Sequence, residues 1–80
     1  MSDKLTVRFG SNGEHVVALQ NGLLQMKFSQ VGEADGAFGV KTEEAVKAMQ
    51  AISSLSPDGI VGPNTGAAID KASGFGGAVL

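Results

Sequence analysis

Apolar side chains recur at helical spacing over residues 14–28, directly after a cluster of turn-forming residues at positions 10–13. They form two neighbouring stripes, one made of Val16, Leu19, Leu23 and Met26 and the other of Val17, Leu24 and Phe28. Two adjacent stripes give a broad apolar face that contacts more than one neighbouring element. The pattern predicts an amphipathic helix over residues 14–28, with Ser11 or Asn12 as its N-cap.

After a connection at residues 29–34, the chain repeats itself. Residues 35–50 read DGAFGVKTEEAVKAMQ, and residues 58–73 read DGIVGPNTGAAIDKAS, so that Asp58 follows Asp35 by 23 positions. The identical pairs are Asp35 and Asp58, Gly36 and Gly59, Gly39 and Gly62, Thr42 and Thr65, and Ala45 and Ala68. A duplication of this kind indicates one supersecondary unit that is used twice.

Each copy begins with an Asp-Gly turn and continues into a helix. In such a turn the carboxylate accepts hydrogen bonds from backbone N–H groups ahead of it, and glycine tolerates a positive φ. Gly39 and Gly62 fall at the expected N-caps, and Pro63 falls at the first helical position, which proline favours. We therefore expect helices over residues 40–51 and 63–72.

Both of these helices are short, and helices below about 12–15 residues are marginal in water. They must therefore pack against the helix over residues 14–28. The hydroxyls of Thr42 and Thr65 lie in the first helical turns, where a free backbone group needs a partner. We predict an all-α, compact three-helix bundle with two duplicated turn-helix units and short extended segments, built as one domain over residues 1–73.

The two ends of the chain carry weaker patterns. Apolar and polar residues alternate over residues 5–9, which is typical of a very short strand. The tail over residues 74–80 is rich in glycine and then apolar. A frayed terminus is the favoured interpretation of this tail, and a peptide that docks on a protein partner or on its own domain is the alternative.

Composition excludes several classes of partner. The 80 residues carry a formal net charge of −2 and no cluster of Lys or Arg. Nucleic acids and anionic membrane surfaces both require concentrated positive charge, so neither is an expected partner. No apolar run approaches the ~20 residues of a membrane helix, and the first residues lack the apolar core of a secretory signal.

Catalytic and metal chemistry find little support in the sequence. His15 is the only histidine and the chain has no cysteine, whereas a zinc site usually needs three or four ligands. Asp35 and Asp58 are the carboxylates placed by the repeated motif, but each one precedes a glycine in a turn, where it stays ionised and binds backbone N–H groups. We therefore expect no enzyme activity, no metal and no cofactor.

Three linked blocks of the sequence resemble the peptidoglycan-binding domain family, a small helical module appended to many cell-wall hydrolases. The blocks are Gly10-x-x-Gly13-x-x-Val16-x-x-Leu19-Gln20-x-x-Leu23, Asp35-Gly36-x-Phe38-Gly39-x-x-Thr42-x-x-Ala45-Val46-x-x-Met49-Gln50, and Leu55-x-x-Asp58-Gly59-Ile60-Val61-Gly62-Pro63-x-Thr65-x-x-Ala68-Ile69. They span residues 10–69 in the family's order and spacing. The departures are Met49 where the family usually has Phe, Ser54 where a Gly is common, and the absence of Trp and Tyr.

The resemblance implies a non-catalytic module that binds peptidoglycan, through its glycan or its stem peptide, and anchors a partner or an appended activity to the bacterial wall or periplasm. The expected site is a shallow groove beside the two turns, formed by backbone groups of the turns with Asp35, Phe38, Thr42, Asp58, Asn64 and Thr65. Phe38 has a second interpretation, as a core anchor. Gln20 and Gln50 are interpreted in two ways, either as boundary residues that bond to the backbone or as amide contacts to the wall.

A structural or protein-interaction role with the same fold is the alternative, for example in a phage particle or a secretion apparatus. The missing signal peptide, the missing Trp and Tyr, and the apolar tail over residues 74–80 favour it.

Overall fold

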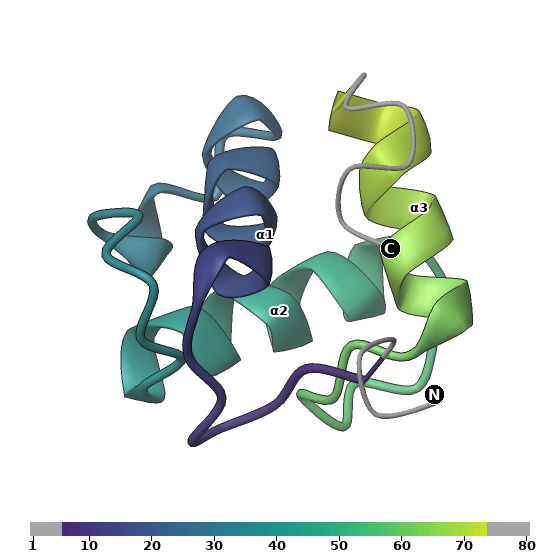
Figure 1. Cartoon of the computed structure of the whole chain (residues 1–80). Coiled ribbons are helices and arrows are strands. Elements are labelled where there is room, and N and C mark those ends of the chain that lie inside the picture. The colour runs from purple at the N-terminus through teal and green to yellow at the C-terminus, as the bar shows by residue number, and fades with distance from the viewer. Residues whose placement is uncertain (1–5, 74–80) are drawn as a thin grey trace.

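The computed structural model describes residues 6–73, which fold into three α-helices and one short 3₁₀ helix (Figure 1). In chain order these are α1 Glu14–Gln25, η2 Ser29–Val31, α2 Val40–Ile52 and α3 Pro63–Ser73. The molecule measures 25 × 25 × 23 Å. The predicted all-α three-helix bundle is confirmed, whereas the tail over residues 74–80 and its docking lie outside the described residues.

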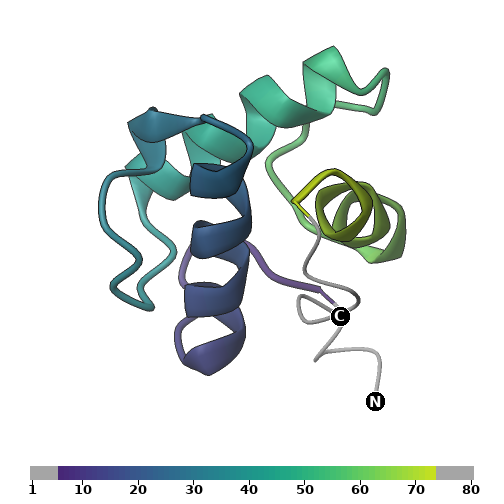
Figure 2. The same cartoon turned by 90° about the horizontal axis from the view of Figure 1, so that it is seen from above.

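Helix α1 organises the bundle, because it contacts α2, α3 and η2. Figures 1 and 2 show α3 beside α1, with α2 running across the pair. Helices α2 and α3, of 13 and 11 residues, thus both pack against α1, as helices of this length require. In the described part of the chain, no helix combines the length and apolar character needed to cross a bilayer.

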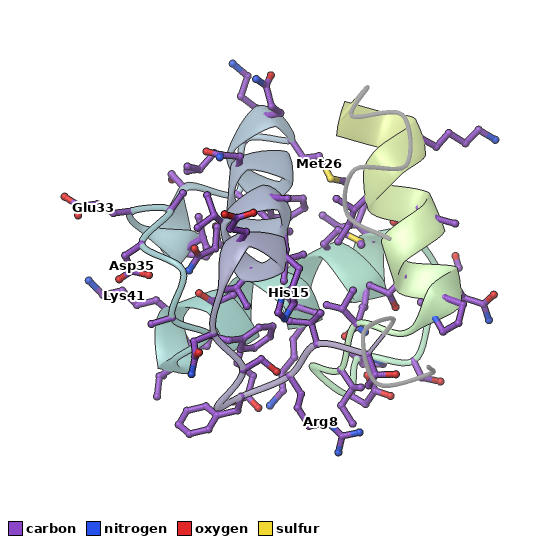
Figure 3. All side chains as sticks on the ribbon, in the orientation of Figure 1. Arg8, His15, Met26, Glu33, Asp35 and Lys41 are labelled. Carbon is purple, nitrogen blue, oxygen red and sulfur yellow. The ribbon has the colours of Figure 1, made fainter. Side chains whose placement is uncertain are left out.

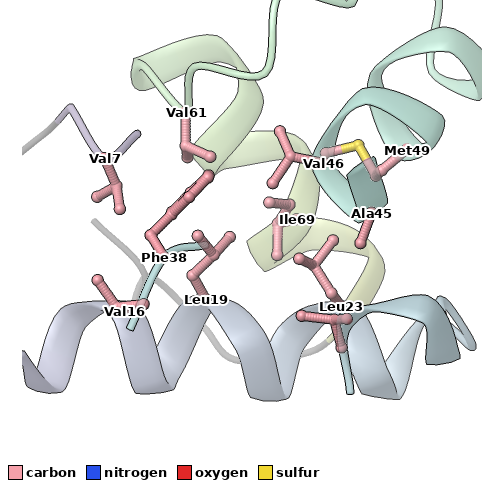
Figure 4. Close-up of a cluster of buried hydrophobic side chains, with 11 residues drawn as sticks. Val7, Val16, Leu19, Leu23, Phe38, Ala45, Val46, Met49, Val61 and Ile69 are labelled. Atoms are coloured by element: carbon pink, nitrogen blue, oxygen red, sulfur yellow. The ribbon is translucent and has the colours of Figure 1, made fainter. Parts of the chain in front are cut away.

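The hydrophobic core lies where α1 faces the two turns and the other two helices (Figure 4). Its members are each at most 3% exposed, and they are Val7, Val16, Leu19, Leu23, Val31, Phe38, Ala45, Val46, Met49, Val61 and Ile69. The second stripe of α1 is half-buried, and its residues Leu24 and Phe28 pack on the edge of this cluster. The apolar pattern of the sequence therefore identified the inward face of α1, whereas Val31 of the predicted connection also enters the core.

Helix α1 ends three residues earlier than its apolar pattern predicts. Lys27 adopts a left-handed φ of 73°. The backbone N–H of Phe28 then donates to the carbonyl of Leu23 at 2.9 Å, and the N–H of Lys27 donates to that of Leu24 at 2.9 Å. This pair of bonds is a Schellman motif, which usually places glycine at the left-handed position. Because this chain has lysine there, the sequence carried no visible stop signal.

Helix α2 ends in the same way. Ser54 adopts a φ of 62°, and the backbone N–H of Leu55 donates to the carbonyl of Gln50 at 2.8 Å. Ser54 is the position at which the resembling family commonly has glycine. Glycine suits that position because the left-handed conformation costs it least, and serine adopts the same turn here.

Glycines, and not polar side chains, precede the helices. Gly13 is the N-cap of α1 and Gly39 that of α2, and neither helix start has a side-chain cap. The expectation that Ser11 or Asn12 caps the first helix is therefore wrong, since the Ser11 hydroxyl accepts the Arg8 N–H at 3.1 Å instead. The predicted glycine at the start of α2 is confirmed.

The extended segment before α1 ties the two turns together. Val7 and Val61 exchange two antiparallel backbone hydrogen bonds of 2.9 and 2.7 Å. Further along the same segment, the N–H of Gly10 donates to the carbonyl of Phe38 at 3.0 Å, and the Phe38 N–H donates to that of Ser11 at 2.9 Å. The predicted short strand is thus reduced to an isolated bridge at Val7, and the segment joins both copies of the repeat.

Candidate functional site

Both Asp-Gly pairs form the predicted turns with closely matching geometry. Gly36 has a φ of 82° and Gly59 a φ of 77°. Residues other than glycine rarely adopt this backbone conformation. The N–H of the residue after each glycine donates to Oδ1 of the aspartate, at 3.0 Å for Asp35 and 2.9 Å for Asp58. Each carboxylate therefore closes its own turn, as the sequence predicts.

These hydrogen bonds hold both carboxylates in their charged form. The Ala37 N–H is the main cause that lowers the pKa of Asp35 below its ordinary value of 3.8, and the Gln20 amide adds to it. The Ile60 N–H is likewise the main cause that lowers the pKa of Asp58. A hydrogen bond to the charged form favours that form. Both aspartates are thus ionised at neutral pH, which does not suit a general acid.

The side chain of Gln20 reaches from α1 into the first turn. Its Oε1 accepts the Gly36 N–H at 2.8 Å. Its Nε2 donates to Asp35 Oδ1 at 3.2 Å, to the Ala37 carbonyl at 3.1 Å and to Thr42 Oγ1 at 3.0 Å. We call this set of contacts the first turn network. It joins α1, the turn and the start of α2 through one buried amide.

Gln50 forms an equivalent set of contacts, the second turn network. Its Oε1 accepts the Gly59 N–H at 2.9 Å. Its Nε2 donates to Asp58 Oδ1 at 3.0 Å, to the Ile60 carbonyl at 3.0 Å and to Thr65 Oγ1 at 3.1 Å. The amide here links α2, the second turn and α3, so each helix of the bundle is fastened to the next by the same device.

The contacts determine the orientation of both amides. A backbone N–H can only donate, and a carbonyl or carboxylate oxygen can only accept. Exchanging Oε1 and Nε2 of Gln20 would therefore set the Gly36 N–H against an NH₂ group, and the same holds for Gln50 and Gly59. The two glutamines are 1% exposed. Their amides bond to the backbone of the turns, which agrees with the first of the two interpretations, and both residues also line a surface pocket.

Sequence reasoning did not connect the glutamines to the repeat. Gln50 follows Gln20 by 30 positions, whereas the rest of the unit repeats at 23, so a fixed period misses the pair. The available signal was local: each glutamine follows a residue predicted to be buried, Leu19 or Met49. The networks also correct the role expected for Thr42 and Thr65, since their hydroxyl oxygens accept the glutamine amides.

One surface cavity lies beside each turn. The first pocket has a volume of about 470 Å³ and is lined by Gln20, Val31, Gly32, Glu33, Asp35, Ala37, Gly39, Val40, Lys41 and Thr42. The second pocket has a volume of about 380 Å³ and is lined by Gln50, Ser54, Leu55, Ser56, Asp58, Ile60, Gly62, Asn64 and Thr65. Two pockets, one at each turn, thus lie where the sequence predicts a groove.

The structure divides the predicted site residues between these pockets. Gln20, Asp35 and Thr42 lie in the first, and Gln50, Asp58, Asn64 and Thr65 lie in the second. Phe38 lines neither pocket, because its ring is 2% exposed and belongs to the core. The ring therefore gives a ligand no stacking surface, contrary to the expected contact.

The first pocket also contains two charged residues, Glu33 and Lys41, that the sequence did not single out. Figure 3 shows Glu33, Asp35 and Lys41 on the same side of the molecule, away from His15. All three are exposed. Over residues 6–73, no group of three or more His, Cys, Asp and Glu side chains is placed to hold a metal ion. The site that this geometry offers is a pair of polar surface pockets with preformed floors.

Comparison with known proteins identifies the family to which this architecture belongs. The family described as "Putative peptidoglycan binding domain" matches residues 12–69. The N-terminal domain of SleB has a crystal structure with a TM-score of 0.81, 34% identity, and coverage of 85% of this chain and 92% of that one. The crystal structure of a peptidoglycan-binding protein from Clostridioides difficile, solved in complex with glutamine hydroxamate, has a TM-score of 0.82 and 33% identity. The match covers 91% of this chain and 45% of that one.

Two curated relatives extend this picture. An uncharacterized protein in the bpoA1 3′ region of Kitasatospora aureofaciens is 43% identical over 65 residues, which cover 81% of this chain and 55% of that protein. A "Probable N-acetylmuramoyl-L-alanine amidase" of Bacillus licheniformis is 37% identical over 73 residues, which cover 89% of this chain and 20% of that protein. The chain therefore spans about half of one relative and a fifth of the other. The matched family, the shared fold and the duplicated turns agree, and the chain belongs to the peptidoglycan-binding domain family.

Proposed function

We propose that this chain is a non-catalytic module that binds peptidoglycan through its two pockets and anchors an appended or partner activity at the bacterial cell wall. The observation that carries the proposal is the duplicated site. Each pocket places an exposed, ionised aspartate over a floor whose buried polar groups are already satisfied. A preformed floor lowers the ordering cost of binding.

The two carboxylates are suited to contact a ligand. Within the two turn networks, the hydrogen bonds to Asp35 and Asp58 all end on Oδ1. The other oxygen of each carboxylate is able to accept a hydrogen bond from a sugar hydroxyl or a peptide N–H. Asn64 adds an exposed amide to the second pocket. The contacts to the wall are thus expected from these exposed groups and from backbone at the turns.

The same features argue against hydrolysis. A glycosidase needs one carboxyl with a raised pKa opposite another across a scissile bond, whereas the pKa of both aspartates is lowered and each lies in its own pocket. The alignment with a fifth of an amidase supports a module that is joined to a separate activity. Binding by one such module is weak, and attachment raises the effective concentration of its partner at the wall.

Co-sedimentation with purified sacculi tests the proposal. We expect the wild-type protein to pellet with sacculi, and the Asp35→Asn/Asp58→Asn variant to bind about fivefold more weakly, since each change removes a charged acceptor. The Glu14→Gln/Glu44→Gln variant is the matched control, because it removes two exposed charges outside both pockets. Full recovery of wild-type protein in the supernatant would refute wall binding, and cleared zones in a zymogram would refute the non-catalytic assignment.

A protein-interaction role for the same fold is the second candidate. Phe9, Val40 and Ile52 are large apolar side chains that remain more than half exposed, and apolar groups on a surface favour protein contacts. This role requires a protein that co-purifies with the chain and dissociates when Phe9 and Val40 are changed to serine. Retention of the partner by that variant would count against it.

A further inference from the structure

The two pockets are built from equivalent positions of the repeat. Every residue that lines the second pocket lies 23 positions after a residue that lines the first, except Gln50, whose counterpart is Gln20. The shared frame comprises the glutamine, the aspartate, the glycine before the helix and the threonine of each turn network. Two copies of one frame allow a direct comparison of the positions that differ.

Five equivalent positions differ, and at two of them the difference concerns charge. Glu33 in the first pocket corresponds to Ser56 in the second, and Lys41 corresponds to Asn64. The first pocket therefore presents an ammonium group together with two carboxylates, those of Glu33 and Asp35. The second presents one carboxylate with a hydroxyl and an amide. The four side chains at these two positions are exposed, so they are free to face a ligand and are not required by the core.

Lys41 supplies the cation of the first pocket. The side chain of Lys41 passes over Gly32, where an added Cβ would lie 3.6 Å from the lysine Cδ. The position equivalent to Gly32 in the second pocket is Leu55. Glu33, Asp35 and Lys41 gather on one side of the molecule (Figure 3). Opposite charges thus line one cavity.

We propose that the two pockets recognise different parts of peptidoglycan: the first binds charged amino and carboxylate groups of the stem peptide, and the second binds the neutral, N-acetylated glycan. This division rests on the proposed wall binding. A peptide that carries both an amine and a carboxylate complements Lys41 on one side and the acidic pair on the other. Sugar hydroxyls and acetamide groups instead pair with the carboxylate, hydroxyl and amide groups of Asp58, Ser56 and Asn64.

The matched probes are a synthetic stem tetrapeptide with a free side-chain amine and a tetramer of N-acetylglucosamine, each titrated into the ¹⁵N-labelled chain. The peptide is expected to shift the backbone signals of Gly32 and Lys41, and the sugar those of Ser56 and Asn64. Raising the salt concentration should weaken the binding of the peptide and leave that of the sugar unchanged, because salt screens exposed charge pairs.

Exchange of the differing residues provides the decisive variants. Glu33→Ser/Lys41→Asn replaces the two charged side chains of the first pocket by those at the equivalent positions of the second, and should weaken peptide binding about fivefold while sugar binding stays unchanged. Ser56→Glu/Asn64→Lys makes the reverse exchange and should create a second peptide site. Because the four side chains are exposed, helical circular dichroism should match the wild type in both variants.

The outcomes separate the two proposals. The division is refuted, and wall binding stands, if sacculi bind but the probes do not discriminate between the pockets. This would be seen if each probe shifts the signals of both pockets alike, if either probe leaves the signals of its assigned pocket unshifted, or if the exchange changes the affinities for peptide and sugar equally. If neither sacculi nor either probe binds, the proposed function fails with it. Selective loss of peptide binding in the first variant would support the division.

Discussion

Replacing Gln20 with methionine tests whether the first turn network stabilises the fold. Methionine retains the length and much of the volume of the side chain but has no amide. The change removes the acceptor for the buried Gly36 N–H and the donor for the buried Thr42 hydroxyl oxygen. It also removes the donor to Asp35, which is exposed and regains water.

The magnitude follows from which partners remain buried. A buried N–H without an acceptor costs about 1–3 kcal/mol, and an ordinary hydrogen bond contributes about 1 kcal/mol. The loss of the Gly36 and Thr42 contacts therefore predicts a fall of about 3 kcal/mol in the free energy of unfolding. A domain of 80 residues has only about 4–12 kcal/mol in total. The expected fall in Tm is about 10–20 °C.

Thermal and urea unfolding of the Gln20→Met and Gln25→Met variants provide the measurement. Gln25 is an exposed glutamine on the same helix, so its replacement should change stability by less than about 0.5 kcal/mol. A Gln20→Met variant that is no less stable than the Gln25→Met variant would show that the network contributes nothing to the fold, and that the buried amide is replaceable by any side chain of its size.

Three further predictions concern the turns and the segment that joins them. Because the pKa of Asp35 and Asp58 is lower in the folded chain than the ordinary 3.8, the unfolded chain takes up protons first on acidification. The stabilising effect of these carboxylates is present above about pH 4 and lost below it. In the Asp35→Asn/Asp58→Asn variant, the free energy of unfolding measured in urea should therefore change less between about pH 5 and pH 2 than in the wild type. A pH dependence equal to that of the wild type would refute this. Gly59→Ala should lower the free energy of unfolding, measured by thermal unfolding, by about 1–2 kcal/mol, because φ is 77° and the added Cβ meets Glu43 Cγ at 3.0 Å. The Cβ added by Gly39→Ala meets nothing within 4 Å, so this control should lose less stability. Equal losses in the two variants would contradict this reasoning. Val7→Ala should lower the free energy of unfolding by about 1–2 kcal/mol, because this side chain is buried against the second turn, and a neutral result in urea unfolding would exclude the segment from the core.

Much of the fold could be predicted because its causes are local. The helical spacing of Val16, Leu19 and Leu23 identified the core face of α1, and the Asp-Gly and Gly-Pro pairs located the turns and the start of α3. These signals depend on the conformational preferences of neighbouring residues and need no knowledge of distant contacts. The end of α1 was missed because Lys27 adopts a conformation that its residue type disfavours.

The site was predicted less completely, because its parts meet only across the bundle. The sequence by itself determined the two turns, their ionised aspartates and the order of the helices. The tertiary structure decided that Gln20 and Gln50 close those turns from neighbouring helices, and it settled which of the two interpretations of Phe38 holds, since the ring belongs to the core. It also decided that one pocket lies beside each turn, and that the first is lined by charged residues, Glu33 and Lys41, where the second has Ser56 and Asn64. A side chain's hydrogen-bond partners depend on which distant backbone groups lack one, and only packing of the whole chain settles that.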